Sequence, residues 1–527
     1  MFRVAKLWRQ QKGSDVGGSS NAPESANHEG SSTTTKQTDR RKIGVSFMPV
    51  KSQQELSDEA QAAQKAHTSQ EAAKEAGIDN NNGTPPVVRS ILEMAHLMML
   101  GHSCKLKACP GYQGGVFYNG KPFCIACGYR DGSKPLDMDD KANHMRLKDP
   151  MLYGTLTLPV TSMLLCQLHE DGVVDLERPL VEYYPELGDQ FSRMTARSIL
   201  KFETVLDSSA ILRDVGASLW KPYLAWNACA SMQQHVYSPI NKFFAAGSTK
   251  PLTGAQQRGN FLEYIRSSAS KVKPNYVPLQ KGRVCHFSVA LLMAVMERQL
   301  GGKSFEEVMR SKIFEPSQSN AAGYGVPQVY RDPNEMFYKP IGQALQHQGF
   351  KSPIPAGSSA NSSPALFNGS LNLYAPSEEF GKLLFLSLDT IHNARSVLGK
   401  EAVNYPHYDF GLLYRPEKDE YSLSRNIFSG MDFVPTSTTF RYNAEYDVGV
   451  FALSSCGTRN GRMFSNAFSR VLQHLFLEHV SKKGINPDES SMDPTVAKSE
   501  TETKFEKIAD EAKYTNVFKR HDSHKRF

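Results

Sequence analysis

The stretch Leu164–Leu176, LLCQLHEDGVVDL, decides the fold that we expect for this chain. It begins as an apolar run at helical spacing, passes through a turn that contains Gly172, and ends in a short apolar segment at Asp175-Leu176. The helix that it closes would begin near Gly154–Leu158, GTLTL. The residue types at that helix start therefore decide which chemistry the chain can perform.

The composition is that of a folded protein with a sizeable core. Of the 527 residues, 40% are hydrophobic and 22% are charged, and the formal net charge is +7. Such a mild basic excess over so long a chain does not indicate nucleic-acid binding. No apolar run approaches the ~20 residues that span a bilayer. Eight cysteines do not indicate a disulfide scaffold, so we expect reduced thiols in an intracellular compartment.

The two ends of the chain differ from its middle. We expect a polar extension over residues 1–85, a folded domain over residues 86–480 and a polar tail over residues 481–527, because the ends hold few apolar residues. Residues 1–12, MFRVAKLWRQQK, combine basic and apolar residues without an acid, which is typical of a mitochondrial targeting segment. A basic tail in solvent or on a partner is the alternative, and a cytoskeletal or ciliary assembly is the alternative location.

In the middle of the chain, the spacing of the apolar residues is helical in some segments and strand-like in others. The dipeptide Asn119-Gly120 is a strong hairpin signal, and it predicts two strands around it within residues 116–129. Strands are also expected between residues 408 and 455. Apolar residues at helical spacing predict helices over residues 87–100, 161–169, 195–202, 287–300, 302–316, 379–388 and 464–479.

Cysteines near the predicted hairpin raise the question of a metal site. Cys124 and Cys127 have the spacing of a zinc knuckle, and Cys104 and Cys109 precede them. Side chains three residues apart on a strand point to opposite faces, however. We therefore expect buried thiols and predict no metal or other cofactor, with zinc as the alternative.

Six stretches in a fixed order resemble the serine β-lactamase and penicillin-binding-protein family. They are similar to the family's opening hairpin, nucleophile-helix end, following short helix, Gly-Lys-Ser phrase, pre-helix strand with its helix, and penultimate strand: residues 115–129, 167–185, 195–206, 302–316, 368–384 and 447–455. The resemblance implies an α/β (α+β) β-lactamase/transpeptidase-like fold. An antiparallel sheet would be flanked by terminal helices, with an all-helical subdomain within about residues 160–365 and long polar extensions.

The first catalytic motif of that family is altered in this chain. The family activates a serine with a lysine one helical turn later, because a hydroxyl is a weak nucleophile without an adjacent base. At the matching positions this chain has Thr155 and Leu158. Threonine could attack weakly, but leucine can neither accept a proton nor carry a charge.

The family's other motifs are altered as well. The Tyr-x-Asn motif falls at Val284-Cys285-His286 or at Phe287-Ser288-Val289, and neither alignment restores it. The Lys-Thr-Gly or His-x-Gly motif falls at Phe428-Ser429-Gly430, where only the glycine remains. The family's His-Thr-Ser-Gly turn reads Phe202-Glu203-Thr204-Val205.

Other nucleophile patterns carry less weight. Ser198 with Lys201 and Ser268 with Lys271 both fit Ser-x-x-Lys, a pattern that is common by chance and here lies outside the expected nucleophile helix. The neighbours Cys285 and His286 would point apart on a helix or a strand. We therefore expect a packed cysteine and a hydrogen-bonded histidine rather than a thiol–imidazole pair.

These replacements predict a pseudoenzyme. We expect a catalytically inactive β-lactamase-like protein that is a structural component of a larger intracellular assembly, with protein partners contacted partly through the polar ends. One alternative is a residual hydrolase of esters or peptides that uses Thr155 or an unrecognised serine. The other is a protein that binds a small molecule in the now apolar pocket.

Overall fold

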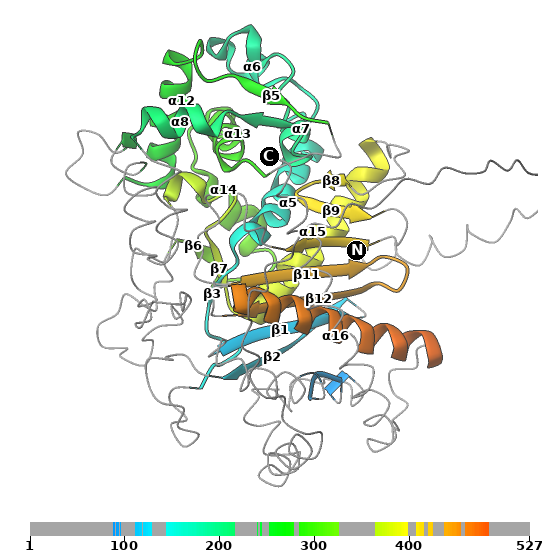
Figure 1. The fold of residues 1–527 in the computed structure, drawn as a ribbon. Coiled ribbons are helices and arrows are strands. Elements are labelled where there is room, and N and C mark those ends of the chain that lie inside the picture. The colour runs from blue at the N-terminus through cyan, green and yellow to red at the C-terminus, as the bar shows by residue number, and fades with distance from the viewer. Residues whose placement is uncertain are drawn as a thin grey trace, which may run out of the picture. The chain divides into compact units, whose positions relative to one another are not determined.

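A computed structural model describes fifteen stretches of the chain, and the fold is built from these residues: 88–89, 91–93, 95, 111–118, 120–128, 144–216, 240, 243–244, 252–278, 284–325, 364–398, 407–415, 420–424, 437–454 and 459–483 (Figure 1). The predicted targeting segment, most of the polar ends, Cys104, Cys109 and the Phe428-Ser429-Gly430 motif lie outside them. Within the described residues, no helix combines the length and the hydropathy needed to span a bilayer.

The described strands include a seven-stranded antiparallel sheet with the order β2-β1-β12-β11-β10-β9-β8. Tyr118 pairs with Lys121 across the two-residue turn of the predicted hairpin, and Gly120 has φ +74°, which glycine adopts without strain. The predicted hairpin and the later strands are therefore confirmed. The strands are β1 Gly111–Tyr118, β2 Lys121–Gly128, β8 His407–Asp409, β9 Leu412–Arg415, β10 Glu420–Ser424, β11 Ser437–Asn443 and β12 Val448–Ser454.

Helices cover both faces of this sheet. On one face α16, Arg459–Lys483, lies across β11 and β12, and its Phe468 ring is 5.4 Å from that of Tyr112 (Figure 1). Phe468 comes so close to β1 that a Cβ at Gly114 would lie 2.6 Å from its ring, which explains a glycine inside this strand. On the other face α15, Ser377–Leu398, packs against β1, β2 and α5, Thr157–Glu170.

The two described zinc candidates belong to different cores. Cys124 of β2 is buried in the core on the α5 and α15 side, whereas Cys127 is buried in the core beneath α16. This is the alternation expected for a strand, and it separates the two thiols by the sheet. No group of three or more metal-ligating side chains lies together among the described residues.

The helical subdomain contains α6, α7, α8, α12, α13 and α14 in its described part (Figure 1). Capping boxes begin three of these helices, at Thr195, Thr253 and Ser304, because each pairs a hydroxyl with the backbone three residues later. The helix expected over 302–316 is shorter, and a π-helical segment, Arg310–Phe314, follows it. The bounds are α6 Leu180–Tyr183, α7 Ala196–Leu200, α8 Ser208–Asp214, α12 Gly254–Ser267, α13 His286–Gln299 and α14 Phe305–Met309.

Short strands and 3-10 turns connect these helices. A three-stranded sheet has the order β3-β7-β6, and a two-stranded sheet joins β4 to β5. The strands are β3 Met151–Leu152, β4 Thr204–Leu206, β5 Pro274–Tyr276, β6 Gly323–Tyr324 and β7 Leu373–Ala375. The turns are η2 Gly154–Leu156, η3 Pro185–Leu187, η4 Asp189–Phe191 and η11 Ala365–Phe367.

A buried ion network joins three helices of the subdomain. Arg258 of α12 has no exposed side-chain surface, and its guanidinium binds Glu297 of α13 and Glu306 of α14. Asn368 also donates to Glu306, and the backbone N–H of Phe305 donates to Glu297. Both carboxylates are thus paired with a cation and with further donors, which is the condition for burying charge.

Candidate functional site

The start of α5 and the 3-10 turn before it hold the two residues that the sequence resemblance assigned to the family's nucleophile and base. Thr155 lies in the 3-10 turn η2 and Leu158 in the first turn of α5, one turn apart. The helix has no side-chain N-cap, but the Thr157 hydroxyl donates to Gly154 O at 2.6 Å and accepts from Leu373 N at 3.2 Å. The Thr157 hydroxyl thereby links the start of α5 to the first residue of β7.

Hydroxyls farther along α5 are tied to backbone carbonyls in the same way. Thr161 Oγ1 donates to Gly369 O at 2.7 Å, which fixes one face of the helix to the segment before β7. Ser162 Oγ donates to Phe410 O at 2.9 Å, which fixes the neighbouring face to the turn between β8 and β9. Both hydroxyl protons are donated to backbone carbonyls, so these side chains have a structural role.

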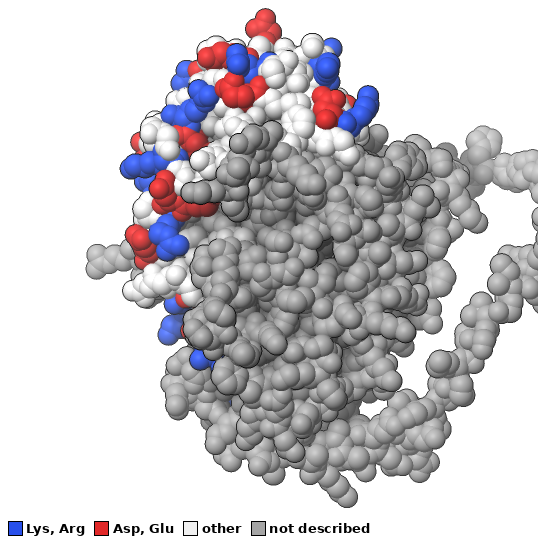
Figure 2. Space-filling view, turned by 90° about the vertical axis from the view of Figure 1, so that its left-hand side faces the viewer, with Lys and Arg blue, Asp and Glu red and all other residues white. Residues whose placement is uncertain are grey.

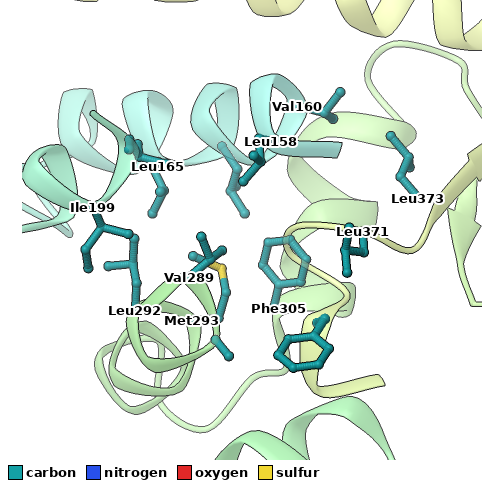
Figure 3. Packing of buried hydrophobic residues seen from close by; sticks show 14 of the residues in the cluster. Leu158, Val160, Leu165, Ile199, Val289, Leu292, Met293, Phe305, Leu371 and Leu373 are labelled. Carbon is teal, nitrogen blue, oxygen red and sulfur yellow. The ribbon is translucent and has the colours of Figure 1, made fainter. Parts of the chain in front are cut away.

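Leu158, at the position of the family's lysine, is fully buried. Figure 3 shows Leu158 and Leu165 of α5 on one side of this core and Val289, Leu292 and Met293 of α13 on the other. The surroundings are apolar side chains and backbone. A charged group at this place would lose its hydration without gaining a partner there.

The turn Phe410-Gly411 packs closely against Leu158. Asp409 pairs with Leu412, so these two residues form a hairpin turn, and their φ values of 48° and 78° are those of a type I′ turn. A Cβ at Gly411 would lie 2.8 Å from Leu158 Cβ, and Gly411 N donates to Leu200 O. The turn therefore occupies the space beside the position where the family has its base.

Thr155 keeps a hydroxyl but has no base beside it. The residue is 3% exposed, and its Oγ1 has no hydrogen-bond partner in the part of the chain that the structure describes. A hydroxyl nucleophile needs a neighbouring base within hydrogen-bond reach. Among the described residues, the geometry supplies none.

One alignment of the Tyr-x-Asn motif places it at residues 287–289. The side chains of these residues belong to the core of the helical subdomain. The Phe287 ring of α13 lies 5.6 Å from that of Phe261 and 5.2 Å from that of Phe367. Ser288 Oγ accepts from Leu206 N at 2.9 Å, and Val289 is buried beside Gly369. Each of these residues is already committed to packing or to a structural hydrogen bond.

The alignment at 284–286 falls at the beginning of α13. Cys285 precedes the helix, and its Sγ donates to Leu206 O at 3.7 Å. The His286 ring is buried with Nδ1 3.1 Å from Ser370 Oγ, and its Nε2 has no hydrogen-bond partner among the described residues. Burial lowers the pKa of His286 to about 3, so the ring is neutral at physiological pH. The two side chains have separate partners, as expected for a packed cysteine and a hydrogen-bonded histidine.

The remaining serine candidates are used locally. Ser198 belongs to the capping box of α7: it donates to Thr195 O and accepts from Thr204 Oγ1. Ser268 ends α12, and Lys271 follows it in an exposed turn. The turn at Phe202 is also changed, since its ring lies 4.8 Å from that of Tyr408 and its φ is 57°.

Sequence reasoning missed two features of this region. The Phe410-Gly411 turn was predicted only as part of a strand region, although a glycine between two short apolar runs is a hairpin signal. The His286–Ser370 contact spans 84 residues of sequence, and no local pattern indicates it.

No protein-family model matches this sequence, and the comparison with curated proteins finds no match either. Among solved structures, the chain is similar to the octameric penicillin-binding protein homologue from Pyrococcus abyssi, with a TM-score of 0.50 and 16% identity over 76% of this chain and 78% of that one.

Two further solved structures are similar to the chain. A D-amino acid amidase from Ochrobactrum anthropi SV3, complexed with L-phenylalanine, has a TM-score of 0.48 and 13% identity over 75% of this chain and 99% of that one. A class C β-lactamase from Rhodobacter sphaeroides has a TM-score of 0.47 and 12% identity over 74% and 99%. The antiparallel sheet, its covering helices and the similarity to the penicillin-binding protein homologue together show that this chain has the β-lactamase/transpeptidase-like fold.

Proposed function

We propose that this chain is a β-lactamase-like protein without acyl-transfer activity, which serves as a structural component of a protein assembly. The observation that carries the proposal is the packing of Leu158, which is fully buried against the Phe410-Gly411 turn at the position of the family's base. A base cannot be supplied from that position. The neighbouring hydroxyls of Thr157, Thr161 and Ser162 hold backbone groups and are not available to replace it.

Acyl transfer would also need an accessible nucleophile. Thr155 is 3% exposed, and among the described residues its hydroxyl has no hydrogen-bond partner that could act as a base. A fold can persist on packing and volume alone, whereas catalysis requires specific polar groups in place. This difference explains how the fold can remain in a chain that has lost the chemistry.

The sequences of the two ends support a role in an assembly. Residues 1–85 and 481–527 are polar, and polar segments of this kind can order on a partner and cover a large surface. The basic, acid-free residues 1–12 favour mitochondria as the compartment, with a cytoskeletal or ciliary assembly as the alternative.

The test of the catalytic part is covalent labelling of the full chain. The protein is incubated with a fluorescent fluorophosphonate and, separately, with an activated acyl ester, and intact mass is measured. We expect no adduct with the wild-type chain or with Thr155→Ala, while an active serine hydrolase in the same buffer is labelled. An adduct that forms on the wild type and disappears in Thr155→Ala would overturn the proposal.

The test of the assembly part is the size of the native protein in a gentle lysate. We expect the tagged full chain to migrate well above its 58.6 kDa monomer mass, and to shift down when high salt disrupts polar contacts. Migration at the monomer mass in low salt would contradict the structural role.

The compartment is tested by comparing the tagged full chain with a variant that lacks residues 1–12. The truncated variant should lose mitochondrial import.

A further inference from the structure

The strand β5 has one unpaired edge within the described structure. It pairs with β4 alone, and Asp207 N and Val277 N donate across that pairing to Lys273 O and Glu203 O. Main-chain groups of an antiparallel strand alternate between its two edges. The carbonyl of Pro274, which has no N–H, and the N–H and carbonyl of Tyr276 therefore point away from β4, to an edge where another strand could pair.

The side chains around this edge present a basic face. Val272 and Pro274 are buried, whereas Lys271, Lys273 and Asn275 are exposed, so the two lysines project outward at a two-residue spacing. Neither lysine forms an ion pair in the described part of the chain. Arg266, in the preceding helix, differs because it is paired with Glu263 at 2.7 Å.

An aromatic residue and an arginine lie on the opposite face of β5, because Tyr276 follows Lys273 by three residues. The Arg193 guanidinium lies 4.4 Å from the centre of the Tyr276 ring, and that ring is 39% exposed. Tyr276 OH donates to Gln190 O, which fixes the ring. A guanidinium stacked on a ring keeps its N–H edge available for a carboxylate.

Among the described residues, no acidic side chain forms an ion pair with Lys271, Lys273 or Arg193. Asp189 is exposed next to Gln190, and Asp207 is engaged in capping α8 through the backbone N–H groups of Ser209 and Ala210. Figure 2 shows one face of the described surface, on which charges of both signs are interleaved. At the β5 edge, by contrast, Lys271 and Lys273 have no acidic partner among the described residues.

We propose that the β5 edge binds an extended acidic segment of a partner protein as an added strand. Main-chain pairing would hold the segment, and its carboxylates would lie against the ammonium groups of Lys273 and of Lys271 in the preceding turn. The inference rests on the proposed role in a protein assembly and gives that role a defined contact surface.

The test is fluorescence anisotropy of the full chain with a short fluorescein-labelled peptide in which glutamate and valine alternate. We expect saturable binding that the K271E/K273E variant weakens about tenfold or more, since two attractions become repulsions. The variant K148E/K303E is the matched control, because it makes the same change in net charge at exposed lysines elsewhere. It should bind as the wild type does, and thermal melting should show that both variants remain folded.

A second peptide separates strand addition from simple charge attraction. N-methylation of alternate residues leaves every carboxylate in place but removes main-chain donors, so this peptide should bind at least about tenfold more weakly. Absence of binding to the wild type, an equal loss in K148E/K303E, or equal binding of the methylated peptide would each overturn the proposal. Peptide binding is measured independently of acylation and of native size, so its failure is distinguishable from a failure of the proposed function.

Discussion

Two buried positions of this protein treat charge in opposite ways. Arg258 is a fully buried cation that binds two carboxylates and a backbone carbonyl, and it ties together three helices. Leu158 is a fully buried leucine at the position that the sequence resemblance assigns to a lysine, and among the described residues it packs in the apolar core and against the backbone of Gly411. This fold can therefore hold a buried cation when carboxylates surround it, as they do at Arg258. The apolar residue at the start of α5 reflects its own surroundings and is not a general exclusion of buried charge.

The difference between the two positions lies in their partners. The Arg258 guanidinium keeps the pKa of Glu306 below its usual range, although burial acts in the opposite direction. Around Leu158, the nearby hydroxyls of Thr157 and Ser162 are committed to backbone carbonyls. Charge placed at Leu158 would have no comparable partner, whereas charge removed at Arg258 would leave two carboxylates unpaired.

The substitution Leu158→Lys should have the largest effect on stability of those that test this comparison. In Leu158→Lys, burial without a partner should cost about 4–7 kcal/mol, which corresponds to a pKa lowered by roughly 3–5 units. Urea unfolding should show this loss, and fluorophosphonate labelling should remain absent. Leu158→Met, which keeps an apolar group of similar volume, should lose less than about 1.5 kcal/mol. A stable, labelled Leu158→Lys protein would show that the site has retained room for a base.

Removing the buried cation tests the other side of the comparison. Arg258→Met leaves Glu297 and Glu306 without their partner and should lower the free energy of unfolding by about 3–5 kcal/mol. Arg266→Met is the control, because its ion pair with Glu263 is about half exposed and is worth about 0–1 kcal/mol. Equal losses in the two variants, measured by urea unfolding, would mean that the network does not stabilise the subdomain.

His286 sharpens the comparison through pH. Its pKa is about 3 in the folded protein and near 6.5 when exposed, so between these values the unfolded chain binds a proton that the folded chain does not. Stability should therefore fall as the pH drops from about 6.5 toward 3, by up to about 1.4 kcal/mol per pH unit. Above pH 6.5 both states are neutral and the effect vanishes.

The variant His286→Asn should show a shallower loss of stability over the same range of pH. His474→Asn is the control, because His474 is 44% exposed and lies on α16. Urea unfolding at a series of pH values gives the slopes. A slope for His286→Asn as steep as that of the wild type would show that His286 does not carry this proton linkage.

Much of the fold could be predicted because local patterns specify it. Asn119-Gly120 placed the hairpin, strand alternation placed Cys124 and Cys127 on opposite faces, and the apolar run after His286 placed α13. The ion network could not be predicted, since Arg258 meets partners 39 and 48 residues away. Such pairs depend on how helices pack, and the sequence shows each charge only in its local setting.

The sequence predicted where the candidate residues lie on the helix but not how they are packed, and their match to the family's motif stays a prediction. Counting along α5 identified Thr155 and Leu158, and the structure places both at the helix start. The contact of Leu158 with the Phe410-Gly411 turn joins residues about 250 positions apart in the chain, and a strand region was all that the local pattern indicated there. Tertiary packing, which no motif encodes, decides how closed the site is.

The smallest expected effect concerns Thr155 itself. Its buried hydroxyl has no described partner, so Thr155→Val should raise the free energy of unfolding by about 1 kcal/mol, because an unsatisfied polar group is removed. Thr161→Val, on the same helix, removes a hydroxyl that donates to Gly369 O and should lower it by about 1 kcal/mol. Both variants replace threonine with valine, but we expect the free energy of unfolding to rise in one and to fall in the other. Urea unfolding measures both changes. If Thr155→Val lost stability as Thr161→Val does, Thr155 would have a partner in the native chain, and the apolar character assigned to this helix start would be wrong.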